Sequence, residues 1–401
     1  MWKLAYRNIW RNKRRTIITI SSVFFAVFFC SVMVSYQSGT WEQMINNALR
    51  TQAGHIEIHG TGYWDDKTVD NFMTMDSATI AQIRMLEEIE NISPRVETFA
   101  LAAFGNTTKG IALIGISPED EAKKSNLASH IVAGEYLSEN DPGIIIGEGV
   151  ANYLKATVGD TLAFIGQGHF GASAAGLFPI RGIFRLAISD LNNGIVYASL
   201  AATQQFVDMP DGYSSILISL KNDKKLDETI KNLNEIVDTS QVDVYSWHFT
   251  MQRLLQQAES DKAFSKMLLF ILYLIVGFGI LGTIIMLTNE RQKEFRTMIS
   301  LGMQRTKLMF VTVIELLIMT CIGLIAGLAA SYPIALYYHF NPIRLSGEAA
   351  QAFIDYGMEP VMPTSIDISI FIAQIVSILI ITILASIYPI RVIGKKLTIN
   401  N

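Results

Sequence analysis

The sequence predicts an α-helical membrane protein with four transmembrane helices and a large α+β domain inserted between the first and the second. Half of the 401 residues are hydrophobic and 17% are charged, and the mean hydropathy of +0.31 exceeds that of ordinary soluble proteins. Residues 16–36, 267–287 and 368–389 are almost without charge over the roughly 20 residues that a helix needs to cross a bilayer. Residues 308–328 form a fourth apolar run, which contains one acid, Glu315.

The basic residues predict that both termini are cytoplasmic. The first 15 residues hold six Lys or Arg and no acid, residues 289–307 hold five against two Glu, and three more follow Pro389. Four spans place these segments on one face, which the positive-inside rule makes cytoplasmic. Residues 37–265, with 16 basic and 29 acidic side chains, then lie on the outer side. The net charge of −4 averages these unlike faces and points to no nucleic-acid partner.

The first span is expected to be retained, because no small-residue cleavage site follows its apolar run. The residues after it are spaced as in an amphipathic helix, at Trp41, Met44, Ile45, Ala48 and Leu49. Residues 249–265 lead into the second span in the same way. A continuous helix over residues 16–52 would be about 55 Å long and would form a stalk; short helices separated by a turn near Gly39 are the alternative.

The large domain shows short β-branched runs interleaved with helical patterns, which favours an α+β domain. A division of this domain into two lobes is one of the arrangements that fit the pattern. The expected strands lie within residues 53–60, 110–116, 143–147, 160–165, 180–184, 194–198 and 214–220. The expected helices are residues 77–90, 147–154, 200–207 and 225–237. Both cysteines, Cys30 and Cys321, fall within spans, so the domain depends on its own core.

The predicted organisation has eleven segments. They are the N-terminal segment 1–15, the spans 16–36, 266–288, 308–330 and 368–389, the stalks 37–52 and 249–265, the domain 53–248, the cytoplasmic coupling segment 289–307, the outer loop 331–367 and the tail 390–401.

Catalytic signatures are missing from the sequence. It contains no G-x-x-x-x-G-K-[ST] motif, so an ATPase is expected to be a separate chain and the protein is not expected to be an enzyme. His55, Glu57 and His59 would share one face of a strand, but two ligands without indicated partners make an exposed polar face the simpler interpretation. No metal site is predicted. Glu315 needs a partner, a cavity or a proton; helix packing is favoured over gating because no second charge lies within a span.

The coupling segment is predicted to be a short amphipathic helix that ends at Gly302. Phe295, Met298 and Ile299 fall on one face and need a surface to cover them. That surface is either membrane lipid or a groove in a separate ATP-hydrolysing subunit.

Phrases along nearly the whole chain carry a resemblance to a known family. They are LAYRNIWRNKRRTIITISS, IALIGISPEDE, GEYL, IIIGEGVANYLKATVGDTL, GIFRLAISDLNNGIVYASLAATQQFV, NERQKEFRTMISLGMQRTKLMFVTVIELLIMTCIGLIAGLAASYP and IYPIRVIGKK. In order and spacing the chain resembles the permease subunits of the MacB/FtsX class of ABC transporters, and within it the lipoprotein-releasing LolC/LolE type.

The resemblance implies a MacB-like type VII ABC fold with a periplasmic domain, in the bacterial inner membrane. Two permeases, identical or homologous, would bind two copies of an ABC ATPase subunit, which uses ATP and Mg²⁺; the permease itself would bind no cofactor. ATP-driven closure would travel along the stalks to the periplasmic domains, which is called mechanotransmission. The substrate would be a lipoprotein, extracted from the outer leaflet and passed to a periplasmic carrier.

The same resemblance makes residues 290–301 the coupling helix. The ATPase contacts it implies are Glu290, Arg291, Glu294, Phe295, Met298, Leu301 and Gly302. Four phenylalanines of the first span are candidates to line an acyl-chain cavity, with lipid-facing side chains as an equal alternative: Phe24, Phe25, Phe28 and Phe29. A Gly-rich loop, residues 166–178, lies where a carrier-binding loop is expected but does not match its sequence; its candidates are Gly166, His169, Phe170 and Phe178.

Two other functions stay open. One is a MacB-like exporter of peptides or antibiotics that works with a periplasmic adaptor. The other is an FtsX-like regulator of a periplasmic hydrolase, which the size of the outer domain disfavours.

Overall fold

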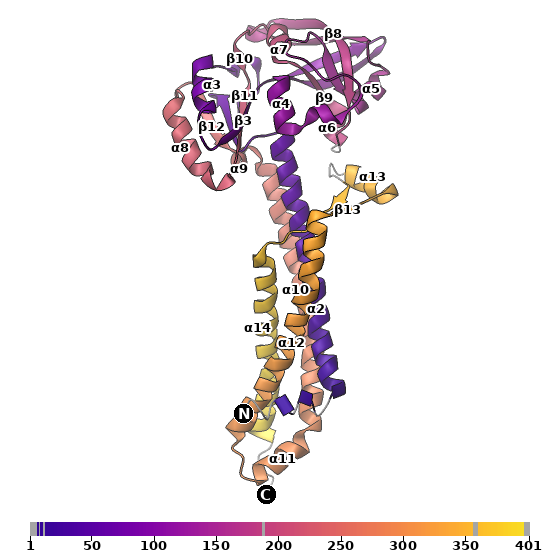
Figure 1. Cartoon of the computed structure of the whole chain (residues 1–401), viewed down its shortest axis with the longest axis vertical. Helices are drawn as coiled ribbons and strands as arrows, with labels where there is room; N and C mark the ends of the chain where they lie inside the picture. Colours follow the sequence, from indigo (N-terminus) through magenta and orange to yellow (C-terminus); the bar gives the residue numbers. More distant parts are fainter. Residues whose placement is uncertain (1–5, 8, 11–12, 187–188, 356–359, 397–401) are drawn as a thin grey trace. The chain divides into compact units, whose positions relative to one another are not determined.

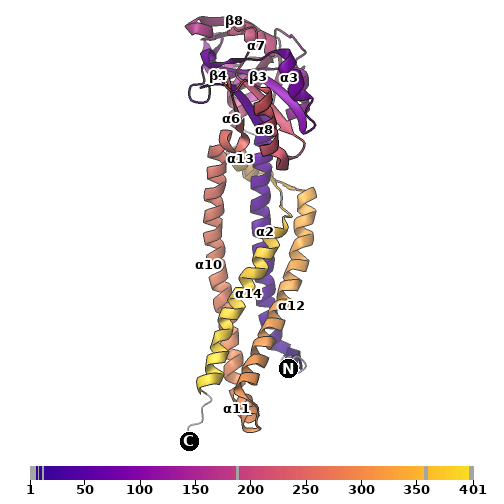
Figure 2. The ribbon, with the colours of Figure 1, turned by 90° about the vertical axis from the view of Figure 1, so that its left-hand side faces the viewer.

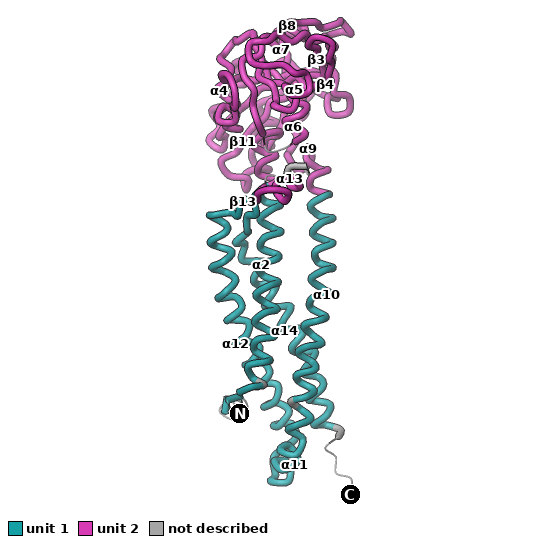
Figure 3. The backbone as a smooth tube through the Cα atoms, turned by 90° about the vertical axis from the view of Figure 1, so that its right-hand side faces the viewer, with its two compact units in different colours: residues 1–43, 257–344, 361–401 teal, residues 44–256, 345–360 magenta. Residues whose placement is uncertain are grey.

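The computed structural model describes the whole chain except residues 1–5, 8, 11–12, 187–188, 356–359 and 397–401. Much of the predicted N-terminal segment 1–15 and part of the tail 390–401 therefore lie outside the described residues. The chain divides into two compact units (Figure 3). The helical unit comprises residues 1–43, 257–344 and 361–401, and the α/β unit comprises residues 44–256 and 345–360.

Four long helices dominate the helical unit (Figure 2). They are α2 (Lys13–Thr51), α10 (Gln252–Glu290), α12 (Arg305–Phe340) and α14 (Ile368–Arg391), with α11 (Gln292–Ser300) between α10 and α12 and a π-helical turn, Val392–Lys396, after α14. Each long helix contains a stretch that is long and apolar enough to cross a membrane. The prediction of four membrane-spanning helices is confirmed.

The first long helix is unbroken past Gly39, so the chain has no turn there. Gly39 instead allows a close approach: a Cβ atom at this position would lie 2.6 Å from the carbonyl carbon of Thr364. The backbone N–H of Ser365 donates to the carbonyl oxygen of Ser35 at 2.8 Å, and the Ser365 hydroxyl donates to Glu42 Oε1 at 2.8 Å. The segment before α14 is thereby fixed against α2.

Two glycines bring α12 close to α2. A Cβ atom on Gly323 would lie 2.7 Å from the carbonyl oxygen of Ile20, and one on Gly327 would lie 2.9 Å from Cβ of Val27. Small residues four positions apart allow two helix backbones to approach within a membrane. The sequence Gly-x-x-x-Gly therefore packs the third span against the first.

A ten-stranded sheet forms the framework of the α/β unit (Figure 1). Its order is β12-β1-β11-β3-β4-β9-β6-β8-β5, and β7 pairs with both β3 and β8. The strands are β1 (Ile56–Gly60), β3 (Ile89–Phe104), β4 (Thr107–Ile116), β5 (Ile131–Gly134), β6 (Ile144–Gly147), β7 (Thr161–Gln167), β8 (Ser173–Phe184), β9 (Ile195–Ser199), β11 (Ser215–Leu220) and β12 (Val242–Ser246). Among the strand pairs that the described residues form in this sheet, β4–β9 and β6–β8 are parallel and the others are antiparallel.

Short helices cover the sheet: α3 (Ser77–Arg84), α4 (Pro118–Ser125), α5 (Glu148–Leu154), α6 (Ser189–Gly194), α7 (Leu200–Phe206), α8 (Leu226–Ile236) and α9 (Trp247–Thr250). The 3-10 turns are Val69–Asn71, Leu127–His130, His169–Gly171 and Asp223–Lys225, and β2 (Met73–Thr74) pairs with β10 (Gly212–Tyr213). The predicted outer loop is partly ordered, because α12 runs on to Phe340 and β13 (Ile343–Arg344), α13 (Gly347–Asp355) and β14 (Val361–Met362) follow.

The long strand β3 joins two hydrophobic cores. Its first half pairs with β11, and its second half pairs with β4 and β7. One core gathers around Ile56, Ile83, Ile218 and Leu233 under α3 and α8, and the other around Leu113, Val150, Phe164 and Val196 under α5 and α7. The unit thus has two lobes that share one strand.

Most predicted elements of this unit are present, and the differences concern two boundaries and several additional elements. The predicted helix 77–90 ends at Arg84, because β3 begins at Ile89. The second stalk begins at Gln252, because residues 247–250 form the separate helix α9. The elements that were not expected from the sequence include β3, β5, β12, α4 and α6.

Candidate functional site

The α11 turn between the second and third spans is the candidate site. α10 ends at Glu290, Arg291 occupies the N-cap position of α11, and Leu301 occupies its C-cap position. Gly302 adopts a φ of 93°, the left-handed conformation that glycine tolerates best. Its N–H donates to Ile299 O at 3.0 Å and the N–H of Met303 donates to Met298 O at 3.0 Å. This pair of bonds is a Schellman motif, and it confirms Gly302 as the helix stop.

Phe295 is buried by the chain itself. Its side chain is 1% exposed and packs with Leu308 of α12 and Ile393 of the π-helical turn. Met298 and Ile299 pack partly against the same cluster. The expectation that Phe295 needs an outside surface to cover it is therefore wrong, because Leu308 at the start of α12 and Ile393 of the π-helical turn already cover it.

Arg291 also points into the chain. Its Nη1 atom donates to Glu315 Oε2 of α12, and its Nε atom donates to Glu294 Oε2 at 3.4 Å. The side chains of Arg291 and Glu315 are only 11% and 6% exposed. The guanidinium carbon lies 5.2 Å from the centre of the Phe295 ring, within cation–π range. Arg291 is therefore engaged within the chain, and its contact with an ATPase stays a prediction.

Glu315 thus has a charged partner. The acid lies within an apolar span, and Arg291 reaches it from the preceding turn, outside any span. This agrees with a helix-packing role for Glu315 and supplies the second charge that the sequence did not reveal. Because an uncompensated charge at such a site is costly, the pair fixes α11 to α12.

The exposed face of α11 carries different residues. Lys293, Arg296 and Leu301 point away from the packed cluster, and Glu290 is exposed at the end of α10. Leu301 is 83% exposed, although it is a large apolar side chain. The face of α11 turned away from the packed cluster therefore presents one apolar and two basic side chains.

The four phenylalanines of α2 form two parallel rows. Phe24 stacks on Phe28 with ring centres 5.9 Å apart, and Phe25 stacks on Phe29 at 6.1 Å. Phe25 and Phe29 are more than half exposed. The rows give one side of α2 a continuous aromatic surface.

The Gly-rich passage belongs to the β7–β8 hairpin. Gly166 lies in β7, and Phe178 is buried in the core beside Phe164, which corrects its assignment to an exposed loop. The tip of the hairpin is residues 168–172, where Phe170 is 85% exposed and its N–H donates to Asp70 Oδ1 at 2.6 Å. The His169 ring contacts the Phe170 ring in a tilted arrangement, with ring centres 3.8 Å apart. Of the four candidates, His169 and Phe170 therefore stand at the tip.

Glu57 and His59 of β1 share one face, which is buried rather than exposed, and His55 lies just before the strand. Glu57 and His59 are buried, and His59 Nε2 lies 3.0 Å from Glu57 Oε2 while Nδ1 lies 2.9 Å from the carbonyl oxygen of Ser214. His55 instead accepts the N–H of Leu220 at 3.1 Å, and burial lowers its pKa. Among the described residues no three His, Cys, Asp or Glu side chains are arranged to hold a metal ion.

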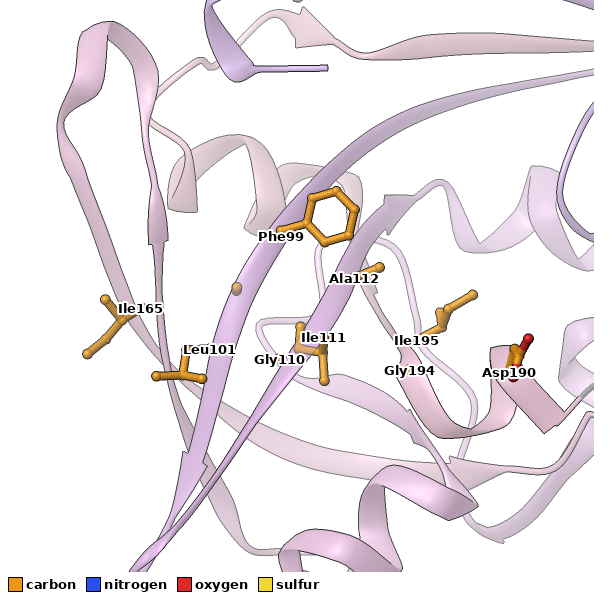
Figure 4. Close-up of a pocket in the computed structure, with 10 residues that line it drawn as sticks. Phe99, Leu101, Gly110, Ile111, Ala112, Ile165, Asp190, Gly194 and Ile195 are labelled. Atoms are coloured by element: carbon orange, nitrogen blue, oxygen red, sulfur yellow. The ribbon is translucent and has the colours of Figure 1, made fainter. Parts of the chain in front are cut away.

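An apolar depression of about 550 Å³ lies on the outer wall of the sheet (Figure 4). Phe99 and Leu101 of β3 and Ile165 of β7 contribute exposed apolar side chains, and Asp190 lies at one end. It holds no cluster of catalytic groups.

Comparisons with known proteins match both parts of the chain. Residues 16–236, more than half of the chain, match the MacB-like periplasmic core domain, and residues 266–397 match the FtsX-like permease C-terminal domain. The solved periplasmic region of MacB from Actinobacillus actinomycetemcomitans is 12% identical with a TM-score of 0.37, covering 53% of this chain and 98% of that one.

Curated relatives resemble the chain over most of its length. The lipoprotein-releasing system transmembrane protein LolC of Neisseria meningitidis is 21% identical, over 95% of this chain and 92% of that protein. LolE of Haemophilus influenzae is 23% identical, over 65% and 63% of the two chains. The macrolide export ATP-binding/permease protein MacB of Campylobacter jejuni is 22% identical, over 85% of this chain and 54% of that protein. With both domain matches in succession, the chain belongs to the MacB/FtsX class of ABC transporter permeases.

Proposed function

We propose that this protein is the permease subunit of an ATP-driven transporter that releases lipoproteins from the outer leaflet of the bacterial inner membrane. Energy comes from a separate ABC ATPase, bound in two copies, and a second permease, identical or homologous, completes the complex. The termini and α11 face the cytoplasm, and the α/β unit faces the periplasm, where a lipoprotein carrier or an adaptor meets it.

The observation that carries this proposal is the way α11 is held. The Arg291–Glu315 pair and the Phe295 cluster fix the helix to α12, while Lys293, Arg296 and Leu301 remain outside. A helix that is fixed on one side and exposed on the other can pass a push from a bound ATPase to the span behind it. Similarity to LolC over 95% of the chain supports lipoprotein release as the use of that push.

The test is ATP-dependent release in a defined system. The permease and its co-purified ATPase would be placed in liposomes with a triacylated lipoprotein, and the soluble lipoprotein–carrier complex would be measured with and without ATP. We expect release with ATP and none with an ATPase whose catalytic Glu is changed to Gln. ATP hydrolysis without any release would refute lipoprotein release.

Export of small molecules is the second candidate, because MacB aligns over 85% of this chain. The same liposomes discriminate the two. Macrolide-stimulated ATP hydrolysis in the absence of lipoprotein would favour the exporter, and lipoprotein-stimulated hydrolysis would favour release.

A further inference from the structure

The last turn of α2 poses a problem that every helix end shares. The final carbonyl groups of a helix have no N–H partner within the helix, and they carry the negative end of its dipole. Glycine in a left-handed turn commonly solves this, as Gly302 does for α11. At the end of α2 the chain reads Arg50, Thr51 and Gln52, and another solution is present.

Two buried basic side chains of the α/β unit bind these carbonyl groups. Arg95 of β3 donates from Nη1 to Gln52 O at 3.1 Å and from Nη2 to Thr51 O at 3.2 Å. Lys124 of α4 donates from Nζ to Arg50 O at 2.8 Å. Three successive carbonyl groups of one helix end are thus held by two side chains from two other elements.

The carboxylate of Glu121 in α4 compensates the positive charge of Arg95, so that both side chains can be buried. It accepts from Arg95 Nη2 at 2.9 Å and from Arg95 Nε at 3.2 Å, and the Ser93 hydroxyl donates to it at 3.0 Å. Arg95 and Glu121 are almost completely buried. The carboxylate orients the guanidinium, so that the remaining N–H groups point at the end of α2.

We propose that Arg95 and Lys124, oriented by Glu121, are positioning residues that grip the end of α2 and make the α/β unit follow its movement. The grip rests on the proposed function, because it becomes useful when a push enters α2 from the helical unit. Hydrogen bonds to the helix end add to the apolar packing around Leu49, and because each bond is directional they resist both pulling and rotation. The substrate-handling unit would therefore move with α2 rather than lag behind it.

Hydrogen exchange tests the grip in the complete permease–ATPase complex in nanodiscs. Lys124→Met removes one of the three bonds to the helix end. Arg95→Met with Glu121→Gln removes the other two and leaves neither Arg95 nor Glu121 as an unpaired buried charge, while Lys124 stays in place. We expect amide exchange over residues 49–53 to rise at least tenfold in both variants. Lys123→Met is the matched control, since Lys123 is exposed and pairs only with Glu119 at 2.7 Å, and it should exchange like the wild type.

Coupling is measured in the same samples as the ATP-induced change in exchange over β3 and α4, beside the rate of ATP hydrolysis. We expect Lys124→Met and the double variant Arg95→Met/Glu121→Gln to hydrolyse ATP at wild-type rates. In both, the ATP-induced change in amide exchange over β3 and α4 should fall at least threefold. A purely structural role would leave that change intact, and either this result or unaltered exchange at residues 49–53 would overturn the proposal. Lipoprotein release is scored separately, so a wild-type complex that shows the ATP-induced change but releases nothing would refute the proposed function and leave the grip standing.

Discussion

Arg291 and Glu315 illustrate how a charge can be accommodated inside an apolar helix. Each side chain alone would be an uncompensated buried ion, and the pair is acceptable because both are present and further bonded to Glu294 and the Phe295 ring. Replacing one of the two side chains should therefore lower the free energy of unfolding more than replacing both.

Glu315→Gln is predicted to lower the free energy of unfolding by about 3–5 kcal/mol, because it leaves the Arg291 cation buried without its carboxylate. The double variant Arg291→Met/Glu315→Met should recover most of that loss. Thermal unfolding in detergent measures both. If the single and the double variant unfold at the same temperature, the pair does not stabilise the α11 turn.

Lys124 makes the stability of the α/β unit depend on pH. Burial, followed by repulsion from Arg95, lowers the pKa of Lys124 to about 7; Glu121, Glu57 and Glu97 oppose the shift. Between about pH 7 and the unfolded pKa near 10.4, the unfolded chain binds a proton that the folded chain does not. Stability should therefore rise with pH in this window, by at most about 1.4 kcal/mol per pH unit.

Urea unfolding followed by tryptophan fluorescence at pH 7, 8 and 9 measures this dependence. Lys124→Met should flatten the profile, and Lys123→Met should leave it unchanged. A wild-type midpoint that falls over this range would contradict the assignment.

At the scale of the element, α11 has a packed face and an exposed face, and the two should respond differently to the same substitution. Leu301→Asp is predicted to leave the fold intact and to reduce capture of the ATPase at least tenfold, because it places a charge in the exposed apolar position. Phe295→Asp should destabilise the α11 turn itself, since Phe295 is buried. Met85→Asp is the control, because Met85 is equally exposed and, like Leu301, occupies the C-cap position of its helix, α3.

Affinity purification of the ATPase, together with a thermal unfolding curve for each variant, separates these effects. Wild-type capture by folded Leu301→Asp protein would show that the exposed face of α11 is not the docking surface.

Helix periodicity and β-branched runs predicted most elements, and the failures have physical reasons. β3 was missed because Asn91, Pro94, Arg95 and Glu97 interrupt its apolar pattern; the structure buries Arg95 by giving it Glu121 and a helix end as partners. α4 was missed because it is short and polar, although its N-cap, Ser117, followed by Pro118 is a helix-start signal. Both elements are polar because their side chains pair with each other, as Arg95 of β3 does with Glu121 of α4.

At the scale of the whole molecule, the sequence predicted the four spans, the inserted domain and the α11 turn, but not how that turn is held. Gly302 acts locally, and its role was visible in the sequence. The partners of Glu315 and of Phe295 come from residues that are distant along the chain, Arg291 and Ile393 among them. Such pairs leave no periodic signal in a single sequence.

α2 is one continuous helix from Gly39 to Arg50. A change in the number of residues between these two positions therefore changes both their separation and their relative rotation about the helix axis. Each inserted residue turns everything beyond it by about 100° and advances it by about 1.5 Å. One alanine added after Asn46 would rotate the last carbonyl groups of α2 by about 100° relative to Gly39. Seven added residues, close to two full turns, would nearly restore the original rotation but would lengthen the helix by about 10 Å. We therefore expect the ATP-induced change in amide exchange of the α/β unit to fall more, per inserted residue, with one added residue than with seven. Evolution can therefore change the side chains of this stretch more easily than it can change their number.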